Sequence, residues 1–149
     1  MSSATHEPIA TLMLVEKSDR SQEALRQFFA SLQIRALITA SPDRALNRLA
    51  EPSPPARGII CSAIELGDAA VDAFNSMATS DHLRHVPALL IANPKQRAVA
   101  DRAQCDDLRK IVFVPMKIPD VIAALSAILD IEPPAPGGSL ADTSANPNE

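Results

Sequence analysis

The feature that most constrains this chain is a regular alternation of short apolar runs with amphipathic stretches. Five near-continuous apolar runs occur, at residues 9–15, 34–40, 58–62, 88–92 and 111–114. Runs of this length without polar alternation are typical of strands that are buried on both faces of a sheet. Each run is followed by apolar residues at helical spacing, so the pattern predicts strand–helix units in series.

The amphipathic stretches carry helix signals of their own. Ser18-Asp19 and Ser41-Pro42 are good helix starts, because serine accepts a hydrogen bond at an N-cap and proline suits the first helical position. Further helices are predicted around residues 70–77, over 95–104 and from Pro119 onward. The apolar residues expected to face the core are Leu25, Phe28, Phe29, Leu32, Ala70, Ala73, Phe74, Met77, Ala98, Val99, Ala103, Val121, Ile122, Leu125, Ile128 and Leu129.

Repeated strand–helix units with short connections predict a parallel sheet that is covered on both faces through right-handed crossovers. The expected fold class is therefore α/β, a flavodoxin-like (βα)5 three-layer sandwich with a five-stranded parallel sheet. We expect this domain to span residues 9–131. Residues 1–8 are predicted to be a disordered N-terminus, and residues 132–149, rich in Pro, Gly, Ser and Asn, a disordered tail.

The bulk composition argues against several functional classes. The net charge is −4 and the 14 lysines and arginines are scattered, which argues against nucleic-acid binding. The cysteines, Cys61 and Cys105, form no C-x-x-C pair, and we expect both to be core thiols. The run at 9–15 is too short for a signal peptide or a membrane span, so a cytoplasmic protein without membrane partners is expected. No glycine-rich phosphate loop follows a strand, and we expect no cofactor.

Three passages of the chain resemble the receiver domain of bacterial response regulators, over residues 9 to 130. They are LMLVEKSDRSQEALRQFFASLQIRALITASPDRALNRL, LRHVPALLIAN and FVPMKIPDVIAAL. In that family a histidine kinase transfers a phosphoryl group to an aspartate after the third strand. Two acids after the first strand hold Mg²⁺, and a Thr or Ser and a Lys contact the phosphoryl group. The resemblance implies a place in a two-component system or phosphorelay, with a histidine kinase or another signalling protein as partner.

The chain departs from the family pattern at nearly every matched position. Glu16 and Lys17 stand where the acid pair is expected, so an ammonium group replaces a metal-binding carboxylate. Ser62 stands at the phosphoacceptor position, and a serine cannot form an acyl phosphate. Ala92 replaces the Thr or Ser, and Pro115 replaces the Lys. We therefore expect no aspartyl phosphorylation, no bound metal and no enzymatic activity.

These losses predict a degenerate receiver, or pseudo-receiver, that acts as a phosphorylation-independent protein–protein interaction module in bacterial signal transduction. The output face of the family maps onto residues 95–130, and a homodimer through this face is an alternative to a different partner. The residues predicted for this face are Lys95, Val99, Arg102, Val114, Met116, Lys117, Val121 and Leu125.

Two interpretations of the Glu16-Lys17 pair stay open at this point. The charges are either solvated or locally paired, or the Lys17 ammonium occupies the former metal position beside Glu16 and Ser62 and holds the domain in one state. Ser62 could itself be a phosphorylation target, although a buried serine at a strand end explains it more simply.

Other functions and sites are alternatives to this interpretation. They are a divergent response regulator phosphorylated at a non-standard site, a flavodoxin-like ligand-binding protein or enzyme, and a DNA-binding regulator. His82 and His85 have a spacing that can bind metal, but a surface loop explains them better. Asp106-Asp107 could form a carboxylate pair for acid–base chemistry, but both residues are expected in a solvated turn.

Overall fold

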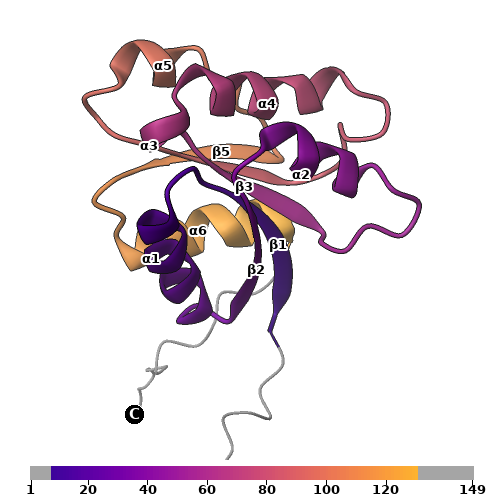
Figure 1. Cartoon of the computed structure of the whole chain (residues 1–149), viewed down its shortest axis with the longest axis horizontal. Coiled ribbons are helices and arrows are strands. Elements are labelled where there is room, and N and C mark those ends of the chain that lie inside the picture. The colour runs from indigo at the N-terminus through magenta and orange to yellow at the C-terminus, as the bar shows by residue number, and fades with distance from the viewer. Residues whose placement is uncertain (1–7, 131–149) are drawn as a thin grey trace, which may run out of the picture.

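The computed structural model describes residues 8–130 of the chain. The disorder predicted for residues 1–8 and 132–149 concerns segments that, apart from Pro8, lie outside the described residues. Figure 1 shows a twisted sheet between two layers of helices. The predicted three-layer α/β sandwich is therefore confirmed.

The sheet contains five parallel strands in the order β2-β1-β3-β4-β5. Observed strand bounds differ from the predicted bounds by at most two residues. Because every strand is parallel to its neighbours, all carboxyl ends meet at one edge of the sheet, which is where open α/β sheets bind ligands. The strands are β1 (Ala10–Val15), β2 (Ile34–Thr39), β3 (Gly58–Ser62), β4 (Ala88–Ala92) and β5 (Arg109–Phe113).

Both helix starts predicted from serine are confirmed. The Ser18 and Ser41 hydroxyls accept hydrogen bonds from the backbone N–H groups of Ser21 and Arg44, each at 3.2 Å. A short additional helix, α3, follows β3 and was not predicted, and the predicted helix over 95–104 is shorter than expected. The helices are α1 (Asp19–Ala30), α2 (Pro42–Leu49), α3 (Ala63–Leu66), α4 (Asp68–Thr79), α5 (Arg97–Asp101) and α6 (Ile118–Leu129).

Two hydrophobic layers hold the helices on the sheet. Helices α1 and α6 cover one face, where Phe29 and Leu129 pack against Leu14. On the other face α2, α3 and α4 bury Phe74 and Met77 with the remaining strand residues. Phe29, Phe74 and Leu14 are fully buried, so each face of the sheet has a well-covered apolar layer.

A buried arginine explains why β5 begins two residues earlier than its apolar run. The Arg109 side chain is 3% exposed, and its guanidinium donates to the carboxylate of Asp106 at 2.9 Å. It also donates to the backbone carbonyl of Arg84 at 2.6 Å and to that of Leu83 at 3.3 Å. These bonds satisfy the two terminal nitrogens of a charged group that the interior would otherwise exclude, whereas the buried Nε has no partner among the described residues. The bonds connect the loop before β4 to the start of β5.

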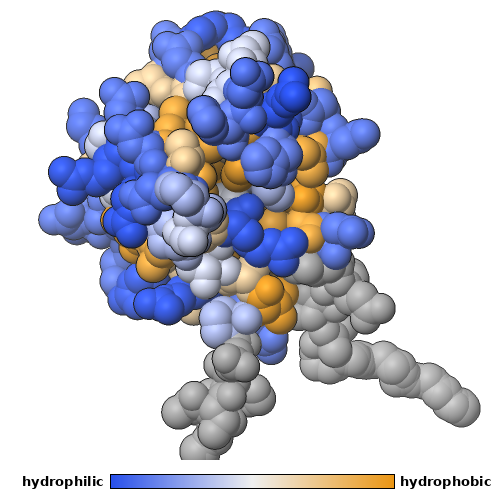
Figure 2. Space-filling model, turned by 90° about the vertical axis from the view of Figure 1, so that its right-hand side faces the viewer, coloured by the Kyte–Doolittle hydropathy of each residue, from blue (hydrophilic) through white to orange (hydrophobic). Residues whose placement is uncertain are grey.

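No helix within residues 8–130 is long and apolar enough to cross a membrane. Figure 2 shows a face that is mostly hydrophilic, with hydrophobic residues visible only in narrow bands. Over the described residues, the large hydrophobic side chains that are substantially exposed are Phe113, at 39%, and Ile118, at 50%. Both belong to the segment from β5 to α6.

Candidate functional site

Two polar side chains meet at the carboxyl edge of the sheet, after β1 and at the end of β3. These strands are neighbours, and Val15 pairs with Cys61. The Ser62 hydroxyl donates a hydrogen bond of 2.6 Å to Oε2 of Glu16, and both residues are fully buried. The structure thus brings together two of the positions predicted from the sequence and joins them directly.

The other oxygens of Glu16 also accept hydrogen bonds within the chain. Its Oε1 accepts a hydrogen bond of 2.7 Å from the backbone N–H of Lys17, and its backbone carbonyl accepts one of 2.7 Å from the Gln22 side chain in α1. Each carboxylate oxygen therefore has a donor from the chain. A buried acid is tolerable when donors satisfy it in this way. Both donors, a hydroxyl and a backbone N–H, are uncharged.

Lys17 contributes its backbone rather than its charge. Its side chain is exposed, and within residues 8–130 the ammonium forms no ion pair with any carboxylate. This placement favours the solvated interpretation of the Glu16-Lys17 pair over the interpretation in which Lys17 replaces a metal.

The other matched positions carry no group for phosphoryl chemistry. Ala92 ends β4, is fully buried and offers only a methyl group. Val114 donates a backbone hydrogen bond of 3.0 Å to the Ala92 carbonyl, and a cis peptide bond joins it to Pro115, which is exposed. Neither residue after β5 carries an ammonium group. Lys117 is an exposed residue at the start of α6 and forms no ion pair within the described part of the chain.

The residues present do not fit the Mg²⁺ ion that the receiver fold implies. Magnesium requires oxygen ligands in near-octahedral geometry, usually including carboxylates. Here Glu16 is the buried carboxylate at the position, and its oxygens already accept hydrogen bonds from Ser62 and Lys17. Over residues 8–130 no group of three or more His, Cys, Asp or Glu side chains is arranged to hold a metal ion.

Sequence reasoning missed Gln96, which lies in the loop between β4 and α5. Its side-chain amide donates a hydrogen bond of 2.8 Å to the carbonyl of Ala63, the residue that follows Ser62. Its carbonyl oxygen accepts one of 2.9 Å from the backbone N–H of Asn93. Gln96 thus ties the β4–α5 loop to the start of α3. A single glutamine in a polar loop gives no sequence signal for such a contact.

The two cysteines have different surroundings. Cys61 is fully buried in the core as predicted, and burial raises the pKa of its thiol to about 12. Cys105 is exposed, so the expectation of a second core thiol was wrong. It lies in the polar turn between α5 and β5, where no apolar layer covers the chain.

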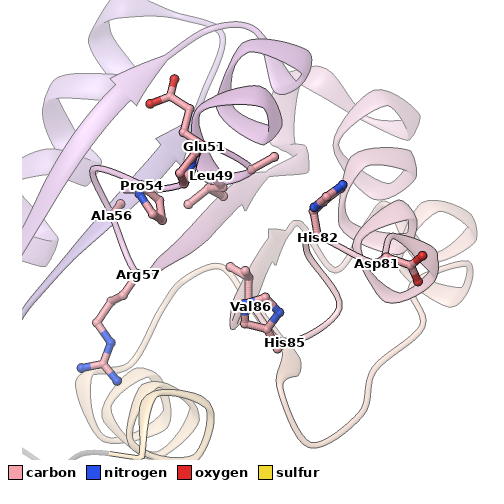
Figure 3. A pocket seen from close by; sticks show the side chains of 11 residues that line it. Leu49, Glu51, Pro54, Ala56, Arg57, Asp81, His82, His85 and Val86 are labelled. Atoms are coloured by element: carbon pink, nitrogen blue, oxygen red, sulfur yellow. The ribbon is translucent and has the colours of Figure 1, made fainter.

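The predicted histidine loop and aspartate turn are at the surface. His82 and His85 are exposed and line a hollow of about 490 Å³ with Asp81 (Figure 3). The hollow lies near the starts of β3 and β4, whereas Glu16 follows the end of β1. The Arg57 side chain, on the rim of this hollow, points toward α6 and donates to the Leu129 carbonyl at 2.7 Å. Asp106-Asp107 is an exposed turn in which Asp106 binds Arg109.

The predicted partner-binding face needs a correction. Val121 is fully buried and Leu125 is 4% exposed, because both side chains of α6 point into the core. They are not available to a partner. Arg102 is at the surface but forms ion pairs with Asp68 and Asp72 of α4. The other residues predicted for this face are exposed or partly exposed: Lys95, Val99, Val114, Met116 and Lys117.

Comparison with known proteins identifies the fold. No family model matches the chain, and no match is found among curated proteins. Solved structures do match. The receiver domain of a sensor histidine kinase from Pseudomonas aeruginosa, which has magnesium in its active-site cleft, superimposes with a TM-score of 0.62 at 16% identity, over 82% of this chain and 98% of that one.

Two further structures give the same result. The signal receiver domain of a signal transduction histidine kinase from Syntrophus aciditrophicus has a TM-score of 0.60 at 16% identity, over 89% of this chain and 99% of that chain. A response regulator receiver protein from Burkholderia phymatum has a TM-score of 0.59 at 22% identity, with coverages of 86% and 99%. The chain therefore has the fold of response regulator receiver domains.

Proposed function

We propose that this protein is a pseudo-receiver that works in signal transduction without being phosphorylated, by binding another protein. The observation that carries the proposal is the buried hydrogen bond between Ser62 and Glu16. It lies where an active receiver of this fold would hold a metal ion beside an aspartate.

The chemistry of the site supports this proposal. Phosphoryl transfer needs an acceptor, a metal ion and a cation to offset the charge on the phosphoryl oxygens. Ser62 is an alcohol with no exposed surface, and its hydroxyl is already bound to Glu16. Ala92 provides no hydroxyl group, and Lys17 is exposed and forms no ion pair within residues 8–130.

The surface suggests where a partner would bind. Phe113 and Ile118 are exposed on the segment from β5 to α6, and a hollow of about 390 Å³ lies between this strand and this helix. Exposed large apolar side chains with a polar rim are typical of interaction sites. A histidine kinase or another signalling protein is the expected partner, given the solved receiver domains of the same fold.

Incubation with radiolabelled acetyl phosphate and Mg²⁺ tests the loss of phosphorylation, with an active receiver as positive control. We expect no acid-stable or acyl-linked label on this protein. Label on any aspartate would favour the alternative of a divergent response regulator with a non-standard phosphorylation site.

A second measurement tests binding. Capture of partner proteins from native cell extract by the full chain should be lost in Phe113→Ser and kept in Lys17→Ala, because Lys17 holds no charged partner. Weakened capture by Lys17→Ala would instead support the hypothesis of a locked state built on this lysine.

A further inference from the structure

β5 is an edge strand that leaves part of its backbone unpaired. It pairs with β4 alone in the sheet. At its ends the Leu108 carbonyl accepts from Ala88, and the Val114 N–H donates to Ala92. In a parallel ladder alternate residues bond to the same neighbour, so the N–H and carbonyl groups of Ile111 and Phe113 point away from β4. The Arg109 backbone is already bonded to Asp106.

Along β5, the two faces of the sheet differ in polarity. On the α5 side, Ile111 is partly buried and Phe113 is 39% exposed, because α5 is a helix of only five residues. On the α6 side lies the hollow of about 390 Å³. Lys110, Lys117 and Asp120 line it together with apolar residues of α6, with Met116, and with Ile111, Val112 and Phe113 along the edge of β5. A strand added at this edge would meet an apolar surface with one set of side chains and the lysines with the other.

The lysines decide which kind of segment fits. Lys110 and Lys117 form no ion pair within residues 8–130, and neither does Asp120. The hollow therefore has an excess of positive charge. A second copy paired antiparallel on β5 would place both Lys110 side chains on the same face of the joined sheet, and lysines on an edge oppose such pairing. Carboxylates in the added strand would instead be attracted.

We propose that β5 binds an extended acidic segment of a partner protein, which adds to the sheet as a further strand beside Ile111 and Phe113. Carboxylates of this segment face Lys110 and Lys117, and apolar side chains at the alternate positions pack on Ile111 and Phe113. Strand addition of this kind takes its affinity from backbone hydrogen bonds and its specificity from alternate side chains. The proposal rests on the proposed function and names the chemistry of the partner at that face.

The test uses a labelled seven-residue peptide with blocked ends that alternates valine and glutamate, with fluorescence anisotropy as the readout. We expect a dissociation constant of about 10 to 300 µM that weakens with added salt. The same peptide with lysine in place of glutamate should bind at least about tenfold more weakly. Equal binding of the two peptides, or no binding of the glutamate peptide, would overturn the proposal.

Protein variants locate the site. Ile111→Pro removes an N–H that points outward, which an edge strand tolerates because its bonds to β4 remain, and we expect peptide binding to be lost. The double variant Lys110→Glu/Lys117→Glu should weaken binding by about tenfold or more, whereas Arg35→Glu, on the opposite edge strand, should not. Binding unchanged in Ile111→Pro would contradict strand addition.

Two outcomes separate this proposal from its alternatives. If sedimentation shows a dimer that Ile111→Pro converts to a monomer, the occupant is a second copy and the acidic-partner proposal is wrong. If the peptide fails while Phe113→Ser still abolishes capture of native partners, strand addition is refuted and the interaction function is kept. If the unchanged protein binds neither the peptide nor any native partner, the result would count against the proposed function as well.

Discussion

Replacing Ser62 with alanine tests whether the buried hydrogen bond at the carboxyl edge holds this site together. The change removes the donor at 2.6 Å from Glu16 and leaves a fully buried carboxylate oxygen without that partner. A hydrogen bond to a charged group contributes about 1.5 to 3 kcal/mol, and an unsatisfied buried acceptor adds a desolvation penalty. We expect Ser62→Ala to lower the free energy of unfolding by about 2 to 4 kcal/mol.

The interaction energy between Ser62 and Glu16 can be measured with a double-mutant cycle. Its second change is Glu16→Met, which removes the carboxylate and keeps a side chain of similar volume. Since replacing both partners by apolar groups can be nearly neutral, the double variant should be more stable than the sum of the single changes predicts. We expect an interaction energy between the two side chains of about 1.5 to 3 kcal/mol.

Urea unfolding followed by far-ultraviolet circular dichroism is the suitable assay, because the chain has no Trp or Tyr for intrinsic fluorescence. Ser53→Ala, at an exposed position of the loop before β3, is the matched control and should change stability by less than about 0.5 kcal/mol. A coupling below about 0.5 kcal/mol would refute the idea that Ser62 satisfies the Glu16 carboxylate.

Three further predictions follow from the packing. Iodoacetamide should modify Cys105 alone in the native protein, because burial raises the pKa of Cys61 to about 12; peptide mass spectrometry checks this, and native labelling of Cys61 would contradict it. Arg109→Met should destabilise the fold by about 2 to 4 kcal/mol in urea unfolding, since it removes the Arg109 donor from the Arg84 carbonyl and leaves the Leu83 carbonyl with Val86 N–H alone. Gly58→Ala should destabilise by about 1 to 3 kcal/mol, because the added Cβ would lie 2.9 Å from the Pro87 carbonyl oxygen; an unchanged melting temperature would show that the strand shifts freely.

The wider fold was predictable because its signals are local. Apolar runs buried on both faces indicated the strands, and Ser18 and Ser41 marked helix starts that depend on a side chain within three residues. The β5 start at Arg109 was missed because a buried arginine is tolerated only through its contacts with Asp106 and the loop before β4. Those contacts join residues up to 26 positions apart in the sequence.

The sequence alone determined which chemical groups are present at the carboxyl edge of the sheet, and the residue types of Glu16, Ser62 and Ala92 led to the prediction that phosphoryl transfer is lost. Only the tertiary structure decided how these groups pair. Ser62 and Glu16 are 46 residues apart and meet because β1 and β3 are neighbours, while Lys17, next to Glu16 in sequence, faces solvent. It also decided that Val121 and Leu125 belong to the core and that β5 is an edge strand. Residue type follows from the sequence, but burial and edge position depend on packing between distant segments.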